Sequence, residues 1–270
     1  MTKAAPAIIS LEEYTESINM LIYGDSGVGK TVFAGSFSAG TSLFLATENG
    51  TISAKRQGST SDLWKIDEWD DLQAAYNWLA DNPNAYNWVM IDSITVMQRK
   101  CMRAILNAAV AENKSRDPDI PAIQDWQKYY NMFERFVAAF NDLPINTLYT
   151  ATTMRSENED SEDIVLPDIQ GKGYHMAQSV CASMGVVGFL KAQTLGKGDD
   201  AQVNRKILFQ SQPPYFAKDR YAVFPRWVSI SEGDKQLTTL DHVTRTIEGK
   251  PRTASKKVTQ IRRRPAAAGR

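Results

Sequence analysis

The feature of this 270-residue chain that most constrains its fold is the stretch LIYGDSGVGKTVFAG at residues 21–35. The pattern G-x-x-x-x-G-K-[ST] is filled there by Gly24, Asp25, Ser26, Gly27, Val28, Gly29, Lys30 and Thr31. The apolar run before it predicts a strand and the residues after it predict a helix, which is the setting of a phosphate-binding loop. The alternative is a glycine turn that joins a strand to a helix and holds no ligand.

Each residue type in this loop has a role in gripping a nucleoside triphosphate. Glycines let successive backbone N–H groups curl around the phosphates. The N-terminus of the following helix adds further N–H groups and its positive dipole end. Lys30 is expected to reach the β- and γ-phosphates, and the Thr31 hydroxyl is expected to bind Mg²⁺. The motif therefore predicts a nucleotide site that uses Mg²⁺.

Strands and helices alternate along the chain, which is typical of a parallel sheet flanked by helices. Apolar runs predict further strands at residues 41–50, 62–66, 85–95 and 145–153. Periodic patterns predict helices within 67–83, near 96–114 and over about 122–142. Strands at 183–192 and 205–212 are expected to form a hairpin. The predicted fold class is α/β, with a mostly parallel twisted sheet and a C-terminal hairpin.

Composition excludes several classes of protein. Hydrophobic residues make up 43% of the chain and charged residues 23%, as in soluble globular proteins. No apolar run approaches the length that spans a bilayer, and the N-terminal residues lack the apolar core of a signal peptide, so we expect a cytoplasmic location and no membrane partner. Cys101 and Cys181 lie far apart, and only His175 and His242 are histidines. Neither a redox pair nor a histidine-based metal site is therefore predicted.

The charge is uneven along the chain although the net charge is zero. Residues 249–270 contain only basic charges, and Arg262, Arg263 and Arg264 form their densest cluster. Pro, Ala, Ser and Thr separate the cations, which predicts a disordered arm that suits a polyanion such as nucleic acid. The alternative is a solubilising tail. We therefore divide the chain into an N-terminal segment (1–17), a nucleotide-binding domain (18–248) and this basic tail (249–270).

Two acidic residues are candidates for binding the metal ion and activating water at the phosphates. Asp92 ends the strand in WVMIDS, at the edge where open α/β sheets bind ligands, and we expect it to hold the Mg²⁺ shell through water. Ser93 rather than a second acid follows it, so the residue that activates water must come from elsewhere. Glu48, at the end of FLATE, is the candidate. The alternative for Glu48 is an exposed acid in a turn.

The order of these features resembles the core of RecA-like ATPases. A phosphate loop is followed by a strand ending in Glu48, a strand ending in IDS, two helices and then LYTATTM. In detail the chain is similar to the short phage-encoded RecA-like recombination proteins, which promote single-strand annealing. The resemblance covers residues 18–228. It implies that the nucleotide is ATP, hydrolysed between the subunits of a homo-oligomeric ring or filament in the cytoplasm of a host cell.

The resemblance also implies roles for three further residues. In PPYFAKDRYAVFP (213–225), Lys218 and Arg220 match the place where RecA-like proteins present basic residues to the nucleotide of a neighbouring subunit. Thr152 or Thr153 occupies the position that senses the γ-phosphate, and we assign that role to Thr153. The alternative for the two cations is a solvated turn.

Segment 154–179 matches the mobile loop with which RecA-like proteins contact single-stranded DNA. Lys172, Tyr174 and His175 offer a cation and two rings for backbone contact and base stacking. An acidic run departs from the family pattern because it repels phosphates: Glu157, Glu159, Asp160, Glu162 and Asp163. We therefore expect QGKGYH and the basic tail to bind DNA, with an acidic surface loop as the alternative.

Together these features predict an ATP-dependent recombination or annealing protein that binds single-stranded DNA, with a single-strand-binding protein or a nuclease as a possible partner. One alternative is a nucleotide-gated loader or assembly ATPase that acts on a protein complex without binding DNA. Another is a small-molecule kinase, which needs an arginine-rich lid, whereas the dense arginine cluster here lies in the tail. Both a ring and a filament, and both annealing and strand exchange, are compatible with these features.

Overall fold

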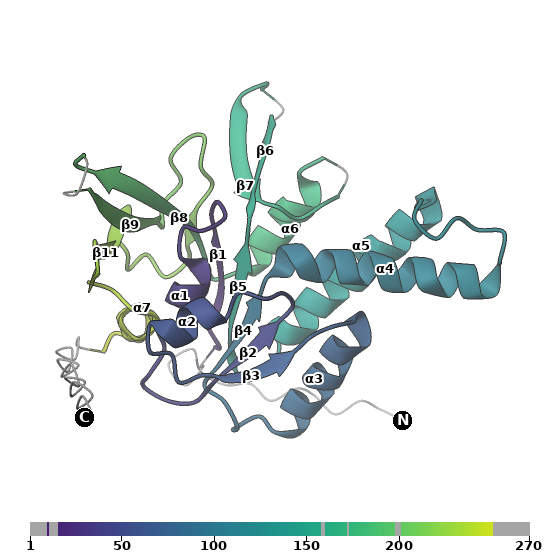
Figure 1. The fold of residues 1–270 in the computed structure, drawn as a ribbon, viewed down its shortest axis with the longest axis horizontal. Helices are drawn as coiled ribbons and strands as arrows, with labels where there is room; N and C mark the ends of the chain where they lie inside the picture. Colours follow the sequence, from purple (N-terminus) through teal and green to yellow (C-terminus); the bar gives the residue numbers. More distant parts are fainter. Residues whose placement is uncertain (1–9, 11–15, 158–159, 172, 198–200, 251–270) are drawn as a thin grey trace, which may run out of the picture.

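The computed structural model describes residues 10, 16–157, 160–171, 173–197 and 201–250. The strands of the main sheet are β1 (Asn19–Tyr23), β2 (Ser42–Ala46), β3 (Asp62–Lys65), β4 (Trp88–Asp92), β5 (Asn146–Ala151), β8 (Val186–Leu195), β9 (Gln202–Leu208), β10 (Lys218–Asp219), β11 (Trp227–Glu232) and β12 (Lys235–Gln236). Their order is β12-β11-β9-β8-β1-β5-β4-β2-β3, with β10 paired to β8 (Figure 1).

The sheet has a parallel part and an antiparallel part. From β8 through β1, β5, β4 and β2 to β3, every neighbouring pair is parallel. The strands added after β8 pair antiparallel, and β8 and β9 form the expected hairpin. Since helices flank this mostly parallel sheet, the predicted α/β fold class is confirmed.

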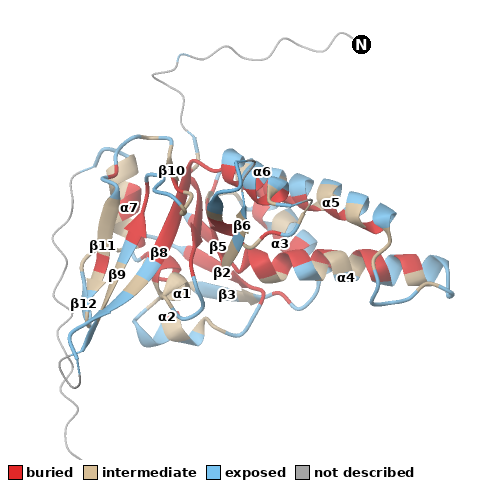
Figure 2. Cartoon of the chain, turned by 90° about the horizontal axis from the view of Figure 1, so that it is seen from above, coloured by how far each residue is buried: buried red, intermediate tan, exposed pale blue. Residues whose placement is uncertain are grey.

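Helices cover both faces of the sheet. They are α1 (Lys30–Ala34), α2 (Ile52–Arg56), α3 (Trp69–Asp81), α4 (Ile94–Glu112), α5 (Ile123–Asn141), α6 (His175–Ser183) and α7 (Leu240–Ile247). Alternate residues of β1 point to opposite faces. Leu21 and Tyr23 pack into the core shared with α3, α4, α5 and α6, whereas Met20 and Ile22 pack into the core shared with α1 and α7. Figure 2 shows the buried residues concentrated in the central strands and on the sheet-facing sides of the helices.

The strand expected at 85–95 is shorter than predicted. β4 ends at Asp92 and α4 begins at Ile94. Ser93 between them caps α4, because its hydroxyl accepts a hydrogen bond from the N–H of Val96 at 3.3 Å. The helix therefore starts directly at the carboxyl edge of the sheet and carries its first turn into the site described below.

Segment 154–179 differs most from the prediction. In its described part the expected loop is replaced by a hairpin of β6 (Thr153–Glu157) and β7 (Asp163–Pro167), followed by the start of α6 at His175 (Figure 1). The run IVLP in β7 explains this, since Val165 and Leu166 are buried in the core. The hydroxyl of Tyr23 on β1 donates to the carbonyl of Val165 at 2.9 Å and so ties the hairpin to the sheet.

Several predicted features lie outside the described residues. These are Lys172, Glu159 and segment 251–270, which includes Arg262, Arg263 and Arg264. Within the described part of the chain, no helix has the length and apolar character needed to cross a bilayer.

Candidate functional site: a nucleotide cleft at the carboxyl edge of the sheet

The phosphate loop lies between β1 and α1, as predicted, and its glycines are required by its geometry. A Cβ atom on Gly24 would lie 2.3 Å from the carbonyl oxygen of Leu190 on β8, closer than any side chain tolerates. Gly29 has a φ of 105°, in the left-handed region that side chains rarely adopt. Lys30 opens α1 directly after it. The backbone is therefore held in a curl that only this glycine pattern permits.

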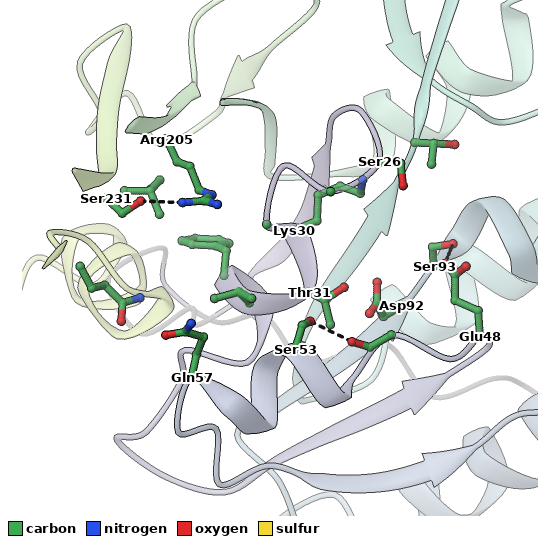
Figure 3. A pocket seen from close by; sticks show the side chains of 18 of the residues that line it. Ser26, Lys30, Thr31, Glu48, Ser53, Gln57, Asp92, Ser93, Arg205 and Ser231 are labelled. Carbon is green, nitrogen blue, oxygen red and sulfur yellow. Dashed lines mark hydrogen bonds between the residues drawn. The ribbon is translucent and has the colours of Figure 1, made fainter. Parts of the chain in front are cut away.

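The loop forms one wall of a cleft of about 600 Å³ (Figure 3). One end of the cleft lies where β2, β4 and β5 end, and the other lies against β9, β11 and β12. The lining residues used below are Gly29, Lys30, Thr31, Glu48, Asp92, Ser93, Thr152, Arg205, Ser231 and Gln236. The sequence assignments of Lys30, Thr31, Glu48 and Asp92 thus fall around one cavity.

Lys30 is positioned at the mouth of the loop. Its Nζ donates to the carbonyl oxygens of Gly24 at 2.8 Å and Asp25 at 2.9 Å. Burial lowers the pKa of Lys30, and the nearby carboxylates of Asp92, Glu48 and Asp25 act in the opposite direction. A half-buried ammonium that rests on carbonyl oxygens is ready to exchange them for stronger phosphate acceptors.

Asp92 is buried at the end of β4, with only 4% of its surface exposed. Burial raises its pKa, and Glu48 raises it further. Hydrogen bonds from the hydroxyls of Thr150 and Thr31, together with the charge of Lys30, lower the pKa in part. The site therefore keeps a carboxylate in an environment that penalises its charge.

These residues fit a magnesium ion. A buried carboxylate beside a threonine hydroxyl is an oxygen donor set of the kind that Mg²⁺ takes when phosphates supply further ligands. A divalent cation would also offset the charge that burial penalises at Asp92. Within the described residues no group of three or more His, Cys, Asp or Glu side chains forms a separate metal cluster. Thr31 and Asp92 would therefore hold the ion together with the nucleotide.

Glu48 lies beyond the end of β2, exposed at the same end of the cleft (Figure 3). Its Oε1 accepts a hydrogen bond from the Ser93 hydroxyl at 2.9 Å. The neighbouring Thr47 binds Ser93 in both directions, since its Oγ1 accepts from the Ser93 N–H at 2.8 Å and donates to the Ser93 carbonyl at 3.0 Å. Glu48 is thus a positioned carboxylate, which is the arrangement that a water-activating base requires.

Thr152 and Thr153 share the position predicted to sense the γ-phosphate. Thr152 lines the cleft, while the hydroxyl of Thr153 donates to the carboxylate of Asp25 in the phosphate loop. Thr153 also begins β6. The junction of β5 and β6 is therefore in direct contact with the phosphate loop.

Arg205 on β9 is a cleft residue that the sequence interpretation missed. Its Nε donates to the carbonyl of Val28 at 3.0 Å, and its Nη1 donates to the hydroxyl of Ser231 on β11 at 3.4 Å (Figure 3). It thereby joins the phosphate loop to the antiparallel strands. No local motif marks it, because it lies in an ordinary strand 177 positions from its loop partner.

Lys218 and Arg220 are not brought into the cleft of their own chain. Lys218 pairs with Val187 across β10 and β8, and its Nζ donates to the carbonyls of Cys181 at 3.3 Å and Ala182 at 2.8 Å. Arg220 donates to the Ala182 carbonyl at 3.3 Å and lies 3.9 Å from Glu16. Both cations therefore stabilise the C-terminal end of α6, consistent with the helix dipole.

The proposed DNA-contacting rings lie at the start of α6. Tyr174 is half-buried and packs against the core, while His175 is exposed, with the two ring centroids 5.1 Å apart. Part of the Tyr174 ring is thus committed to packing.

Comparison with known proteins places the chain in a family. The family described as "AAA domain" matches residues 16–221, which is most of the chain. The chain belongs to this family. A search of the curated proteins finds no match. Among solved structures, the flagellar accessory protein FlaH from Methanocaldococcus jannaschii is similar over 82% of this chain and 89% of that chain, with 10% sequence identity and a TM-score of 0.38.

Membership of the AAA domain family agrees with the chemistry of the cleft. The matched residues contain the phosphate loop, Glu48 and Asp92. The chain is therefore a P-loop ATPase, of a family that generally uses ATP and Mg²⁺. The strands β11 and β12 and the helix α7 lie beyond the matched residues.

Proposed function

We propose that this ATPase is a recombination or annealing protein that binds single-stranded DNA under the control of ATP, and that it hydrolyses ATP at the interfaces of a ring or filament. The observation that supports this proposal is a chain of hydrogen bonds from the nucleotide cleft to the segment before α6. Tyr174, for which we predicted DNA contact, lies in that segment, and His175 begins α6 directly after it.

The hydrogen-bond chain begins at Thr152, which lines the cleft. Its N–H donates to Thr95 Oγ1 on the first turn of α4 at 3.1 Å. The Thr95 hydroxyl in turn donates to the Asp168 carbonyl at 3.1 Å. Gln98, one turn further along α4, donates to the same carbonyl at 2.9 Å and accepts from the Gln170 N–H at 2.6 Å. A shift of β5 on nucleotide binding would therefore move residues 168–170 and the segment that follows them.

The hydrolytic step uses five side chains of the cleft. Glu48 polarises the attacking water, and Lys30 offsets negative charge that develops on the γ-phosphate. Asp92 and Thr31 would hold Mg²⁺, which would neutralise charge on the phosphate oxygens. The Ser93 hydroxyl fixes Glu48 in place through the 2.9 Å hydrogen bond. The products are ADP and phosphate, with the proton of the water transferred through Glu48.

The interface part of the proposal concerns Lys218 and Arg220. In one chain their donors contact the end of α6, but Arg220 remains exposed, with 47% of its side chain accessible. Arg220 is therefore the better placed of the two to reach the nucleotide of a neighbouring subunit as an arginine finger. Arg220→Ala should then lower the rate of hydrolysis only under conditions in which the protein assembles.

The experiment that tests the proposal measures ATP hydrolysis with and without single-stranded DNA, with Lys30→Ala as the blank. We expect DNA to stimulate the rate. The assay is repeated at low salt because contacts to phosphates weaken steeply as salt rises. A rate that is indifferent to DNA at low salt would contradict the DNA-binding part of the proposal while leaving the ATPase assignment intact.

One observation favours a nucleotide-gated assembly ATPase as the second candidate. The tip of the α4–α5 hairpin exposes two large apolar side chains, Ile120 at 66% and Ile123 at 90%. Exposed apolar side chains at the end of a protruding element are typical of a protein contact. ATP-dependent assembly without any affinity for oligonucleotides would favour this candidate.

A further inference from the structure

A second hollow of about 940 Å³ lies between α4 and α5. These helices extend away from the phosphate loop as an antiparallel pair (Figure 1). Small or flexible apolar side chains line it between the two helices, namely Ala104 and Ala108 on α4 and Met132 on α5. The result is a groove, separate from the nucleotide cleft, that neither the sequence motifs nor the ATPase chemistry uses.

The groove is rich in basic side chains. Arg99, Lys100 and Arg103 come from α4, and Lys128 and Arg135 come from α5. Arg99 and Lys128 are exposed, and their side chains make no hydrogen bond or ion pair with another described residue. The Arg103 ion pair with Asp119 is solvent-exposed, with 60% and 72% of the two side chains accessible, so it holds Arg103 only weakly.

The acids of the groove are confined to the end where α3 begins. They are Asp67, Glu68 and Asp70. Asp67 forms an exposed ion pair with Lys65 at 2.8 Å, and its carbonyl accepts a hydrogen bond from the Lys100 Nζ at 2.8 Å. The remainder of the groove, toward the tip of the helix pair, therefore carries positive charge.

The cations are arranged in rows rather than around one point. Arg99 and Arg103 are one helical turn apart, about 6 Å along α4, and Lys128 and Arg135 are two turns apart, about 10 Å along α5. Two rows of cations on facing walls suit an extended chain of phosphates better than a single small anion. Arg99 and Arg103 also border a smaller hollow of about 290 Å³, which contains Trp126 and Gln170.

Two residues of this smaller hollow have further roles. Trp126 can stack on a base, and Gln170 links the surface to the nucleotide cleft. Trp126 is half-buried and so offers part of its ring for stacking on a base. Gln170 belongs to the hydrogen-bond chain that starts at Thr152. Cations beside an aromatic ring are typical of surfaces that bind single-stranded nucleic acid. The hydrogen-bond link to the ATP site would make this surface sensitive to the bound nucleotide.

We propose that the α4–α5 groove binds the phosphate backbone of single-stranded nucleic acid. This inference rests on the proposed function and assigns the binding to a site other than the segment before α6 or the basic tail. A row of phosphates pairs with Arg99, Arg103, Lys128 and Arg135, and a base beside the ridge of α4 stacks on Trp126.

The test compares two double variants of the full-length protein. Lys128→Gln with Arg135→Gln removes two cations from the groove. The matched control, Lys191→Gln with Lys206→Gln, removes two exposed cations from β8 and β9. Affinity for a fluorescent oligo(dT) is measured by anisotropy over a salt series, together with ATP hydrolysis in the absence of DNA.

We expect the groove variant to bind more weakly and its salt dependence to be shallower. Loss of two phosphate contacts makes the negative slope of log K against log salt shallower by about 1.4, since each contact to a single strand contributes about 0.7. The control should keep the wild-type slope, and both variants should keep the wild-type rate of DNA-independent hydrolysis.

Three results would overturn the inference, and they are distinguishable. If wild-type protein fails to bind oligo(dT) at low salt, the DNA-binding part of the proposed function fails and the groove assignment fails with it. If wild type binds but the groove variant matches the control, only the groove assignment is wrong. If the groove variant matches the control in DNA affinity and also loses ATP-dependent self-association, measured by sedimentation velocity, the groove is a contact between copies of the chain.

Discussion

The two ends of the nucleotide cleft are built in different ways. At the phosphate end, Asp92 ends a parallel strand, while Lys30 and Glu48 follow the carboxyl ends of two others. At the other end, Arg205, Ser231 and Gln236 lie on the antiparallel strands β9, β11 and β12. The first end contains charged groups that can act on a γ-phosphate, whereas the second end offers contacts that can hold the rest of a nucleotide.

The two ends also differ in how far the family describes them. The AAA domain match covers the whole phosphate end but stops before β11 and β12. We infer that the chemistry resides in the end that the family match covers completely. We also infer that affinity and the choice of base are set at the other end, where the match includes Arg205 on β9 but neither β11 nor β12. The predictions below test that division of labour.

The largest effect is expected for Lys30→Ala. Lys30 is the ammonium at the mouth of the phosphate loop, where it rests on the carbonyls of Gly24 and Asp25. Without it, charge on the β- and γ-phosphates is not offset, so both ATP affinity and turnover should be lost. Steady-state hydrolysis and a direct binding titration check this. Hydrolysis that survives the substitution would show that the phosphate end does not carry the chemistry.

Glu48→Gln should separate chemistry from binding. The amide keeps the acceptor for the Ser93 hydroxyl but cannot take a proton from water. Hydrolysis should fall by about 100- to 10,000-fold, the range for a general base, with little change in ATP affinity. Single-turnover hydrolysis measured beside a binding titration checks both quantities. A native rate in the variant would show that another group activates the water.

The sequence predicted that the residues of the phosphate end lie together, because each of their signals is local. A glycine pattern at fixed spacing and acids at the ends of apolar runs are visible without a fold, since parallel strands bring their carboxyl ends to one edge. The other end was missed because Arg205 meets Val28 only after β8 and β9 have folded back as a hairpin. The hairpin within 154–179 was missed for a different reason. There a resemblance to a mobile loop outweighed the local apolar run that buries Val165 and Leu166.

Arg205→Ala tests the far end directly. The guanidinium bridges the Val28 carbonyl and the Ser231 hydroxyl at the wall of the cleft. A hydrogen bond from this charged donor to a bound nucleotide would contribute about 1.5–3 kcal/mol to binding. ATP affinity should therefore fall by about tenfold or more, with a smaller change in the rate of the bound complex. Lys206→Ala, the exposed neighbour on β9, is the control and should bind as wild type. A loss of rate without a loss of affinity would place Arg205 among the groups that act on the γ-phosphate.

The smallest effect concerns the stability of the nucleotide-free protein and the charge of Asp92. Burial raises the pKa of Asp92 above its ordinary value of 3.8, so the folded state binds the proton more tightly than the unfolded state. The free energy of unfolding should then fall as pH rises through the interval between these two pKa values, and the ionised carboxylate should be a cost at neutral pH. Asp92→Asn removes that cost and keeps an acceptor for the Thr150 hydroxyl.

Thermal melts at acidic and neutral pH measure this effect. Asp92→Asn should have a higher melting temperature than wild type at neutral pH, and the difference should shrink in acid. For a chain of this size, 1 kcal/mol corresponds to a shift of about 2–4 °C. Thr150→Val, which leaves the carboxylate without that donor, should shift the melt in the opposite direction. If Asp92→Asn melts below wild type at neutral pH, then Lys30 and the two threonine hydroxyls more than offset the burial of the charge. In that case the phosphate end would add to the stability of the fold. The contrast between an end where a buried charge lowers stability and an end that only binds the nucleotide would then not hold.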